Sequence, residues 1–320
     1  MKNIILMFSM FISLGIFVSA GTFADIQRDV MASIKESPEE AVQRIVKTYT
    51  GSDITTNANV MKALKAIIQS KNGTFNDFTR VYNYAVDTDL IQTKNQDGYE
   101  RIGKDRANLL SASAAARDDV FNYIADEYFM RGGSPNRFMI DVFQYADVPP
   151  MLSKMFSKLP KKWQDKYTPI EKTNVIMSFA YDYCEYGSYL KDFLTVVKPE
   201  EITNYFDASY LYMFYRGGDG IYGMNEKCIG KTNVTEILIR TLKNPDKLRA
   251  DYGKKKIPLL ALWALQDSQY DEFLDLTKIL LDNGSNVYSK VEVDGKSKTI
   301  LQIVEERGTD AAIELVKQYK

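Results

Sequence analysis

Apolar residues recur at three- and four-residue spacing along most of the chain, as in 60–68, 120–124 and 237–242. This spacing places apolar side chains on one face of an α-helix. The stretches 37–40 (Ser-Pro-Glu-Glu) and 168–171 (Thr-Pro-Ile-Glu) each combine a capping hydroxyl, a first-turn proline and a glutamate at the capping-box position, so they predict helix starts. The pattern as a whole predicts an all-α fold.

One segment departs from this helical pattern. Residues 291–295 (Val-Glu-Val-Asp-Gly) predict a short extended finger and nothing larger. We find no alternating run with a tight Asn-Gly turn that would indicate a sheet.

Two similar segments follow one another in the last quarter of the sequence. The first opens a helix at 257–260 (Ile-Pro-Leu-Leu) and ends in a second helix and turn at 278–287. The second begins at 294–296, opens its own helix after 299 and closes with a helix at 311–317. Such self-similarity indicates a repeat architecture, in which stacked helix pairs bury a continuous core.

This order of finger, inner helix, outer helix and turn resembles the ankyrin repeat. The matching positions are helix-start residues, a Leu-Leu pair and two glycines that follow helices: Pro258, Leu259, Leu280, Leu281, Gly284, Thr299, Leu301 and Gly308. Both glycines are expected to take the left-handed conformation that stops a helix. Leu260 stands where the family has His, and Leu262 and Val304 stand where it has Ala, which indicates wider packing between helices.

The resemblance is clear over about 257–319 and degenerate over about 106–256. It implies a solenoid of antiparallel helix pairs with long finger loops over 106–320, whose fingers and concave face bind partners. Residues 25–105 are expected to form a helical N-terminal region that holds degenerate repeats or a cap. HEAT-like helix pairs remain an alternative for the N-terminal half.

The first 24 residues differ from the rest of the chain. A positively charged start (1–3) precedes an uncharged apolar stretch (4–18), and small residues follow. This is the pattern of a secretory signal peptide, with cleavage expected after Ala20 or Ala24. The chain is therefore expected to be an exported, bacterial-type protein of the periplasm or extracellular space, with no stable membrane insertion after cleavage.

Export also bears on the two cysteines of the chain, Cys184 and Cys228. A disulfide persists in an oxidising compartment. Because the sequence does not give the distance between their β-carbons, a disulfide and two buried free thiols both remain open.

Composition narrows the chemistry further. The chain has no histidine, which excludes Ser-His-Asp and Cys-His nucleophile pairs and His-ligated zinc. Two cysteines are too few for a four-cysteine zinc site or an iron–sulfur cluster. With 41 basic and 42 acidic side chains, the net charge of −1 gives no reason to expect nucleic acid as a partner. We predict no catalytic residues, no cofactor and no metal site.

One glycine motif invites a nucleotide-binding interpretation. Residues 218–223 have the spacing Gly-x-Gly-x-x-Gly. A dinucleotide-binding turn needs a preceding strand, whereas the residues before this motif indicate an inner helix. Because Arg-Gly-Gly occurs at both 131–133 and 216–218, we interpret both as helix stops.

Aromatic residues make up 12% of the chain, and most are expected in the core. Four lie in predicted fingers and are, by the resemblance, candidate partner contacts or else covers of small apolar clusters: Trp163, Tyr167, Tyr252 and Tyr288. Lysines 254–256 form a basic finger that suits an acidic partner or is simply solvated. The chain is thus predicted to be a non-enzymatic protein–protein interaction module. The alternative is a helical envelope enzyme that uses carboxylate and tyrosine chemistry.

Overall fold

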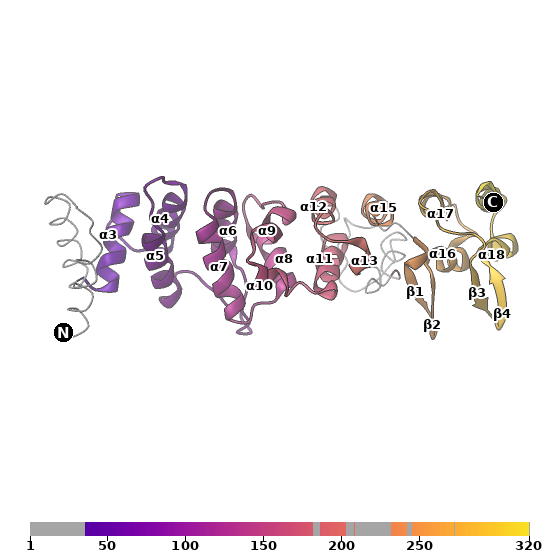
Figure 1. The fold of residues 1–320 in the computed structure, drawn as a ribbon, viewed down its shortest axis with the longest axis horizontal. Helices are drawn as coiled ribbons and strands as arrows, with labels where there is room; N and C mark the ends of the chain where they lie inside the picture. The colour runs from indigo at the N-terminus through magenta and orange to yellow at the C-terminus, as the bar shows by residue number, and fades with distance from the viewer. Residues whose placement is uncertain are drawn as a thin grey trace, which may run out of the picture. The chain divides into compact units, whose positions relative to one another are not determined.

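A computed structural model describes residues 36–181, 186–202, 208, 232–241, 245–271 and 273–319. Over these residues the fold is mostly helical, with two short hairpins, which confirms the all-α prediction (Figure 1). The predicted signal peptide, both cysteines and the glycine motif 218–223 lie outside the described residues. Within the described ranges, every helix is too short or too polar to cross a bilayer.

The chain divides into two compact units, Met1–Ile91 and Gln92–Lys320, here called the N-terminal unit and the C-terminal unit. This division precedes the one proposed from the sequence at 105–106. Residues 92–103 therefore belong to the C-terminal unit, where they are bonded to its first helices.

The described part of the N-terminal unit consists of three helices that pack against one another: α3 (Pro38–Thr50), α4 (Asn57–Gln69) and α5 (Phe75–Asp87). Their apolar faces form a core that includes the fully buried side chains of Val46, Leu64 and Phe78. Each helix begins at a hydroxyl side chain that accepts a hydrogen bond from a first-turn backbone N–H. Local capping and one apolar stripe per helix therefore account for these elements.

The C-terminal unit begins with an isolated bridge between Lys94 and Glu100. The helices that follow are α6 (Lys104–Ala116), α7 (Asp118–Met130), α8 (Pro135–Tyr145), α9 (Leu152–Lys158), α10 (Lys161–Gln164), α11 (Pro169–Tyr181), α12 (Gly187–Phe193) and α13 (Pro199–Ile202). The later described elements are α15 (Thr232–Thr241), the 3-10 helix η3 (Pro245–Lys247), β1 (Arg249–Tyr252), β2 (Lys255–Pro258), α16 (Leu259–Asp267), α17 (Phe273–Asp282), β3 (Lys290–Val293), β4 (Lys296–Thr299), α18 (Ile300–Arg307) and α19 (Asp310–Gln318).

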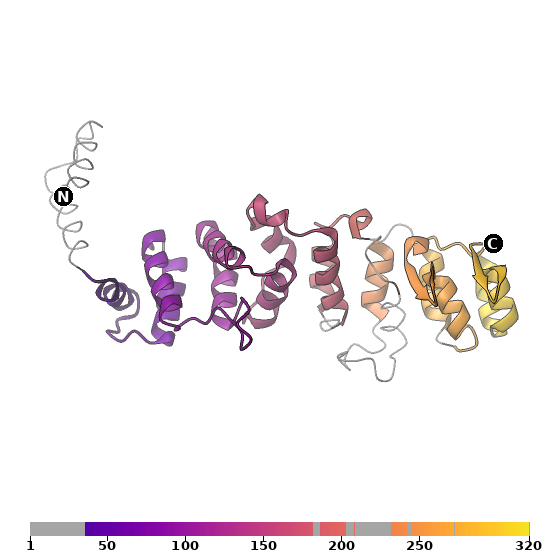
Figure 2. The same ribbon diagram turned by 90° about the horizontal axis from the view of Figure 1, so that it is seen from below.

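Helices of this unit contact their neighbours in two series (Figures 1 and 2). In one series α6 packs on α8, α8 on α11, α11 on α13, and α16 on α18. In the other, α7, α9, α12, α15, α17 and α19 each pack on the next. Contacts such as α6 with α7 and α18 with α19 join the two series. The packing is therefore mainly between helices that are close in chain order.

Several hydrogen bonds between these elements join residues that lie 35–43 positions apart in the sequence. Examples are Ile102 N to Asp141 Oδ2 (3.3 Å), Ser153 N to Asp192 Oδ2 (2.8 Å) and Asn286 N to Asp246 Oδ2 (3.1 Å). The same separation recurs from the first helices of the unit to the last.

The two predicted capping boxes have different outcomes. Ser37 and Glu40 form a complete box, because each side chain accepts a hydrogen bond from the other residue's backbone N–H. The Thr168 hydroxyl accepts from Glu171 N at 3.4 Å, but the Glu171 carboxylate accepts from Asn136 N at the start of α8 (3.2 Å). The second glutamate therefore joins two helices and does not close its own box.

The predicted finger at 291–295 is confirmed as part of the antiparallel hairpin β3–β4. Asp294 and Gly295 form its turn with φ of 50° and 73°, as a two-residue hairpin turn with positive φ at both positions requires. A second hairpin, β1–β2, is paired from Arg249↔Pro258 to Tyr252↔Lys255. The sequence indicated this segment only as a basic finger.

The two glycines of the repeat motif end helices for different reasons. Gly284 has φ of +97°, so the predicted left-handed stop after α17 is confirmed. Gly308 has φ of −81°, so the same prediction is wrong there. A β-carbon at 308 would lie 2.7 Å from the Val304 carbonyl oxygen and 3.3 Å from Ala312 Cβ. The end of α18, with Ala312 of α19 beside it, therefore leaves no room for a β-carbon at this position.

Asparagine tolerates the left-handed region better than alanine does. If these two causes hold, asparagine should be tolerated better than alanine at position 284 but not at position 308. We expect Gly284→Ala to lower the free energy of unfolding by about 1–2 kcal/mol and Gly284→Asn to lower it less. At Gly308 both substitutions are expected to cost about 1–3 kcal/mol, because either adds a β-carbon. Urea denaturation of the four variants measures this, and a better tolerance of Asn than Ala at 308 would contradict the steric explanation.

Candidate functional site

The two hairpins form a paired projection from the helices of the C-terminal unit. β1 and β2 both contact α16, and β4 contacts α18. Ala250 and Ile257 are buried on one face of the first hairpin, and Val291 and Val293 on one face of the second. Residues paired across a hairpin share a face, so Lys255 in the first hairpin and Lys296 and Lys298 in the second lie on the same face as these buried residues. Asp251, Lys256 and Glu292 lie on the opposite faces. The turns stay exposed.

Polar contacts join the hairpins to each other and to η3. Lys255 Nζ lies 2.6 Å from Glu292 Oε2, across the space between the hairpins. The Asp246 carboxylate accepts hydrogen bonds from Asn286 N (3.1 Å) and Ser289 Oγ (3.0 Å). Buried apolar side chains thus hold each hairpin on its helix, and the Lys255–Glu292 ion pair joins one hairpin to the other.

Two of the four candidate contact residues lie beside this projection. Tyr252 ends β1 opposite Lys255 and is half-buried. Tyr288 precedes β3 and is 48% exposed, and its backbone N–H donates to Asn286 Oδ1 (2.8 Å). Both rings are therefore placed where a partner of the hairpins would meet them.

The other two candidates lie elsewhere and are largely engaged inside the fold. Trp163 in α10 stacks on Phe129 with ring centroids 4.9 Å apart, and its Nε1 donates to Asp126. Tyr167 is only 3% exposed and meets Phe156 edge-on at 5.4 Å. The prediction that Tyr167 contacts a partner is wrong, because its ring is buried among apolar side chains, and burial raises its pKa. Trp163 retains partial exposure while it anchors α10 to α7.

Tyr99 is one of the exposed aromatic residues that the sequence analysis did not single out. Tyr99 is 73% exposed, in a turn where Asn95 Oδ1 accepts from Asp97 N (3.1 Å) and Tyr99 N (2.9 Å). The sequence Asn95-Gln96-Asp97-Gly98 could have indicated this turn, because Asn and Asp side chains bond to nearby backbone groups in turns. This turn precedes α6, as the hairpins precede α16 and α18.

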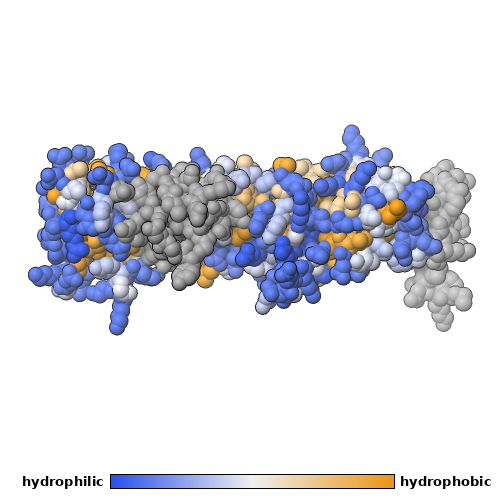
Figure 3. All heavy atoms as spheres, turned by 180° about the vertical axis from the view of Figure 1, so that it is seen from behind, coloured by the Kyte–Doolittle hydropathy of each residue, from blue (hydrophilic) through white to orange (hydrophobic). Residues whose placement is uncertain are grey.

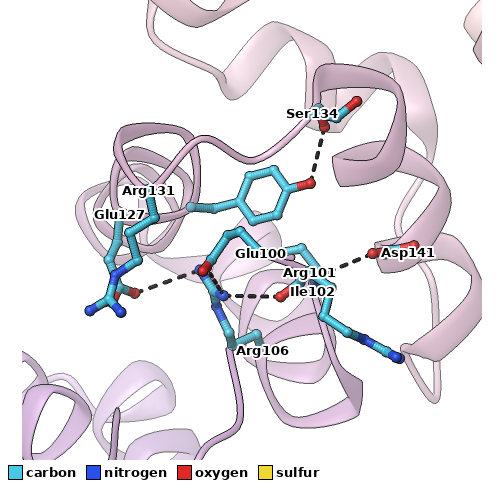
Figure 4. A network of polar contacts seen from close by, with 9 residues as sticks. Glu100, Arg101, Ile102, Arg106, Glu127, Arg131, Ser134 and Asp141 are labelled. Carbon is cyan, nitrogen blue, oxygen red and sulfur yellow. Dashed lines mark hydrogen bonds and ion pairs between the residues drawn. The ribbon is translucent and has the colours of Figure 1, made fainter. Parts of the chain in front are cut away.

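A buried charge network lies at the start of α6 (Figure 4). The fully buried Arg106 donates from Nη1 to Glu100 Oε1 (2.6 Å) and to the Arg101 carbonyl (3.0 Å). Its Nη2 lies 3.6 Å from Glu127 Oε2, and the other Glu127 oxygen pairs with Arg131 at 2.7 Å. The network thus ties the loop before α6 to α7.

Further polar groups extend this network to α8. The Tyr128 ring lies against the Arg106 guanidinium, with its centroid 5.6 Å from Arg106 Cζ. The Tyr128 hydroxyl donates a hydrogen bond to the Ser134 carbonyl (3.1 Å). Burial raises the pKa of Glu100, Asp141 and Tyr128. Glu100 Oε1, Asp141 Oδ2 and both oxygens of Glu127 are paired with donors of the protein itself, whereas Glu100 Oε2 is buried without a hydrogen-bond partner. These contacts join the loop before α6 to α7 and α8.

The N-terminal unit has a cleft of about 430 Å³ between α3 and α5. Glu36 lines it, but its carboxylate receives two hydrogen bonds from Arg44, at 2.9 and 3.0 Å. This pairing lowers the pKa of Glu36, which opposes a role as general acid.

Within the described ranges, no group of three or more acidic, histidine or cysteine side chains is placed to hold an ion. Hydrophilic side chains predominate on the face seen in Figure 3, where apolar ones form separate patches. No family model, curated protein or solved structure matches this chain.

Proposed function

We propose that the C-terminal unit is a solenoid of ankyrin-like helix pairs that acts as a non-enzymatic protein-binding module. On the pattern of its first 24 residues, the protein would act outside the cytoplasm, in the periplasm or the extracellular space. The partner would be another protein.

One observation carries this proposal: polar contacts recur at a separation of 35–43 residues through the C-terminal unit. In a stack of repeats each unit contacts its neighbours, so a repeat length of sequence should separate bonded residues. The order of hairpin, helix and helix over 249–282 and again over 290–318 supports the ankyrin-like form over the HEAT-like one.

Support for binding comes from the turns that precede the inner helices. Tyr99, Tyr252 and Tyr288 lie on or beside such turns and keep their rings at least partly exposed. Tyrosine supplies rigid contact area together with a polar tip, and it is enriched where interfaces concentrate their binding energy.

A triple variant tests this proposal. We expect Y99A/Y252A/Y288A to lose most of the partner that the parent chain captures from its own envelope extract or culture medium, because each substitution removes a ring that is at least partly exposed. Quantitative mass spectrometry of the captured protein measures the loss, at unchanged helicity and melting by circular dichroism.

The matched control is Y270A, because Tyr270 is also exposed but lies in the turn between α16 and α17, away from the hairpins. Capture should survive this substitution. Equal capture by the triple variant and the parent would contradict binding through these turns, and loss with Y270A alone would place the contact elsewhere.

A further inference from the structure

Positive charge is concentrated on the two hairpins, although the chain as a whole has a net charge of −1. Residues 249–258 and 290–299 carry three acidic and seven basic side chains. The basic ones are Arg249, Lys254, Lys255, Lys256, Lys290, Lys296 and Lys298. We call these two segments the hairpin surface.

Four of the basic side chains form no ion pair with any residue in the described part of the chain: Arg249 and Lys290 at the base of the hairpins, and Lys254 and Lys296 at their tips. Lys255 and Lys298 are paired with carboxylates, Glu292 and Glu306 respectively. Lys254 lies in the turn of the first hairpin, and Lys296 follows the turn of the second. Both of these lysines are exposed. A ligand therefore meets one solvated ammonium group at each tip.

The hairpin surface is also preorganised. Buried apolar residues hold each hairpin on its helix, and the Lys255–Glu292 pair links one hairpin to the other. A ligand that spans both tips therefore does not have to order a flexible loop, which lowers the entropic cost of binding.

We propose that the hairpin surface binds an acidic segment of a polypeptide, which lies across both tips. This inference rests on the proposed function and names the class of partner. Carboxylates on an extended chain would pair with Lys254 and Lys296, while the half-buried Tyr252, next to the turn of the first hairpin, would contact the chain beside Lys254.

The same residues disfavour two other polyanions. Asp251, Glu292 and Asp294 interrupt the positive charge and would face the regularly spaced phosphates of a nucleic acid. An anionic membrane surface needs apolar side chains that enter the lipid, whereas the hairpin turns consist of Gly253-Lys254 and Asp294-Gly295. A flexible acidic peptide can place its charges between the carboxylates.

The test uses a fluorescently labelled poly-glutamate peptide and fluorescence anisotropy with the full chain at about 50 mM salt, where surface charges are weakly screened. We expect K254E/K296E to weaken binding at least about tenfold. The control K154E/K191E changes the net charge equally but lies on α9 and α12, and it should change the affinity less than about twofold. The affinity of K254Q/K296Q for the peptide should lie between that of the parent chain and that of K254E/K296E.

Three results would overturn the inference: no binding of poly-glutamate by the parent chain, equal weakening in the tip and control variants, or tighter binding of a DNA oligonucleotide or phosphatidylglycerol vesicles.

Capture of proteins from the extract separates this inference from the proposed function. If K254E/K296E captures the envelope partner as well as the parent does, while the tyrosine variant does not, the binding module stands and the acidic-segment assignment fails. If K254E/K296E no longer binds poly-glutamate, but neither the parent chain nor any variant captures a protein from the extract, the proposed function fails instead.

Discussion

Replacement of Arg106 by methionine is expected to lower the free energy of unfolding of the helices around it by about 3–5 kcal/mol. The substitution preserves much of the side-chain volume but leaves the buried Glu100 carboxylate without its cationic partner. Removal of one member of a buried ion pair strands the other in a medium of low polarity. Urea denaturation and hydrogen exchange of residues 94–131 would measure the loss.

The double variant E100Q/R106M is the control, because it removes both charges together. We expect it to recover most of the lost stability, since Glu127 keeps its pairing with Arg131. Equal instability of the single and double variants would show that packing by the arginine side chain matters and that charge does not.

The effect of R106M should also depend on pH. Burial raises the pKa of Glu100, and the hydrogen bond and charge of Arg106 oppose this rise. Loss of Arg106 raises the pKa further, so Glu100 in the folded variant holds its proton to higher pH than in the unfolded chain. Such a group stabilises the fold at low pH and loses this contribution as pH rises through its folded pKa. The deficit of R106M should therefore be smaller at about pH 4 than at about pH 7.

Truncation of Trp263 to alanine is the second large expected effect. Trp263 is fully buried in α16, and its Nε1 donates to the Phe273 carbonyl (3.1 Å). The cavity and the unsatisfied carbonyl should together cost about 3–5 kcal/mol. In the proposed stack of repeats, stability is transmitted only through neighbouring units, so the loss should be confined to the elements near α16.

The chain has two tryptophans, and this makes the locality measurable. In W263A the fluorescence of Trp163 reports the α7–α10 region, where its ring stacks on Phe129. We expect its urea transition to shift little, while hydrogen exchange in α16 and α17 accelerates strongly. W263F is the control, since it retains most of the ring and should lose less. If W263A lowers the urea midpoint of the α7–α10 region as much as that of α16 and α17, the stacked-repeat proposal is contradicted.

Features set by neighbouring residues were predictable from the sequence. The Ser37–Glu40 capping box, the left-handed Gly284 and the finger turn at Asp294-Gly295 all depend on bonds or dihedral angles within a few positions. Thr299 belongs to the same group, because its side chain caps α18 and Gln302 closes the box. The bonds that residue type and spacing predict are present in these cases, whereas Gly308 and Glu171 carry the same signals with a different outcome.

Features set by distant residues were not predictable. Glu171 is in the right place to close a capping box, yet its carboxylate bonds to Asn136, 35 positions earlier. The β1–β2 hairpin has a lysine-rich second strand with little strand preference, and burial of Ala250 and Ile257 stabilises it. The separation of 35–43 residues between such hydrogen-bonded partners is visible only once the chain is folded.

The sequence by itself determined that this chain is helical, where several helices begin and end, and that histidine-dependent chemistry is absent. Only the tertiary structure decided which aromatic side chains face solvent. Trp163 and Tyr167 pack against α7 and α9, whereas Tyr99 and Tyr288 remain exposed. The physical reason is that helix spacing depends on local backbone bonds, while the burial of a loop residue depends on side chains contributed by distant helices, such as Asp126 beneath Trp163.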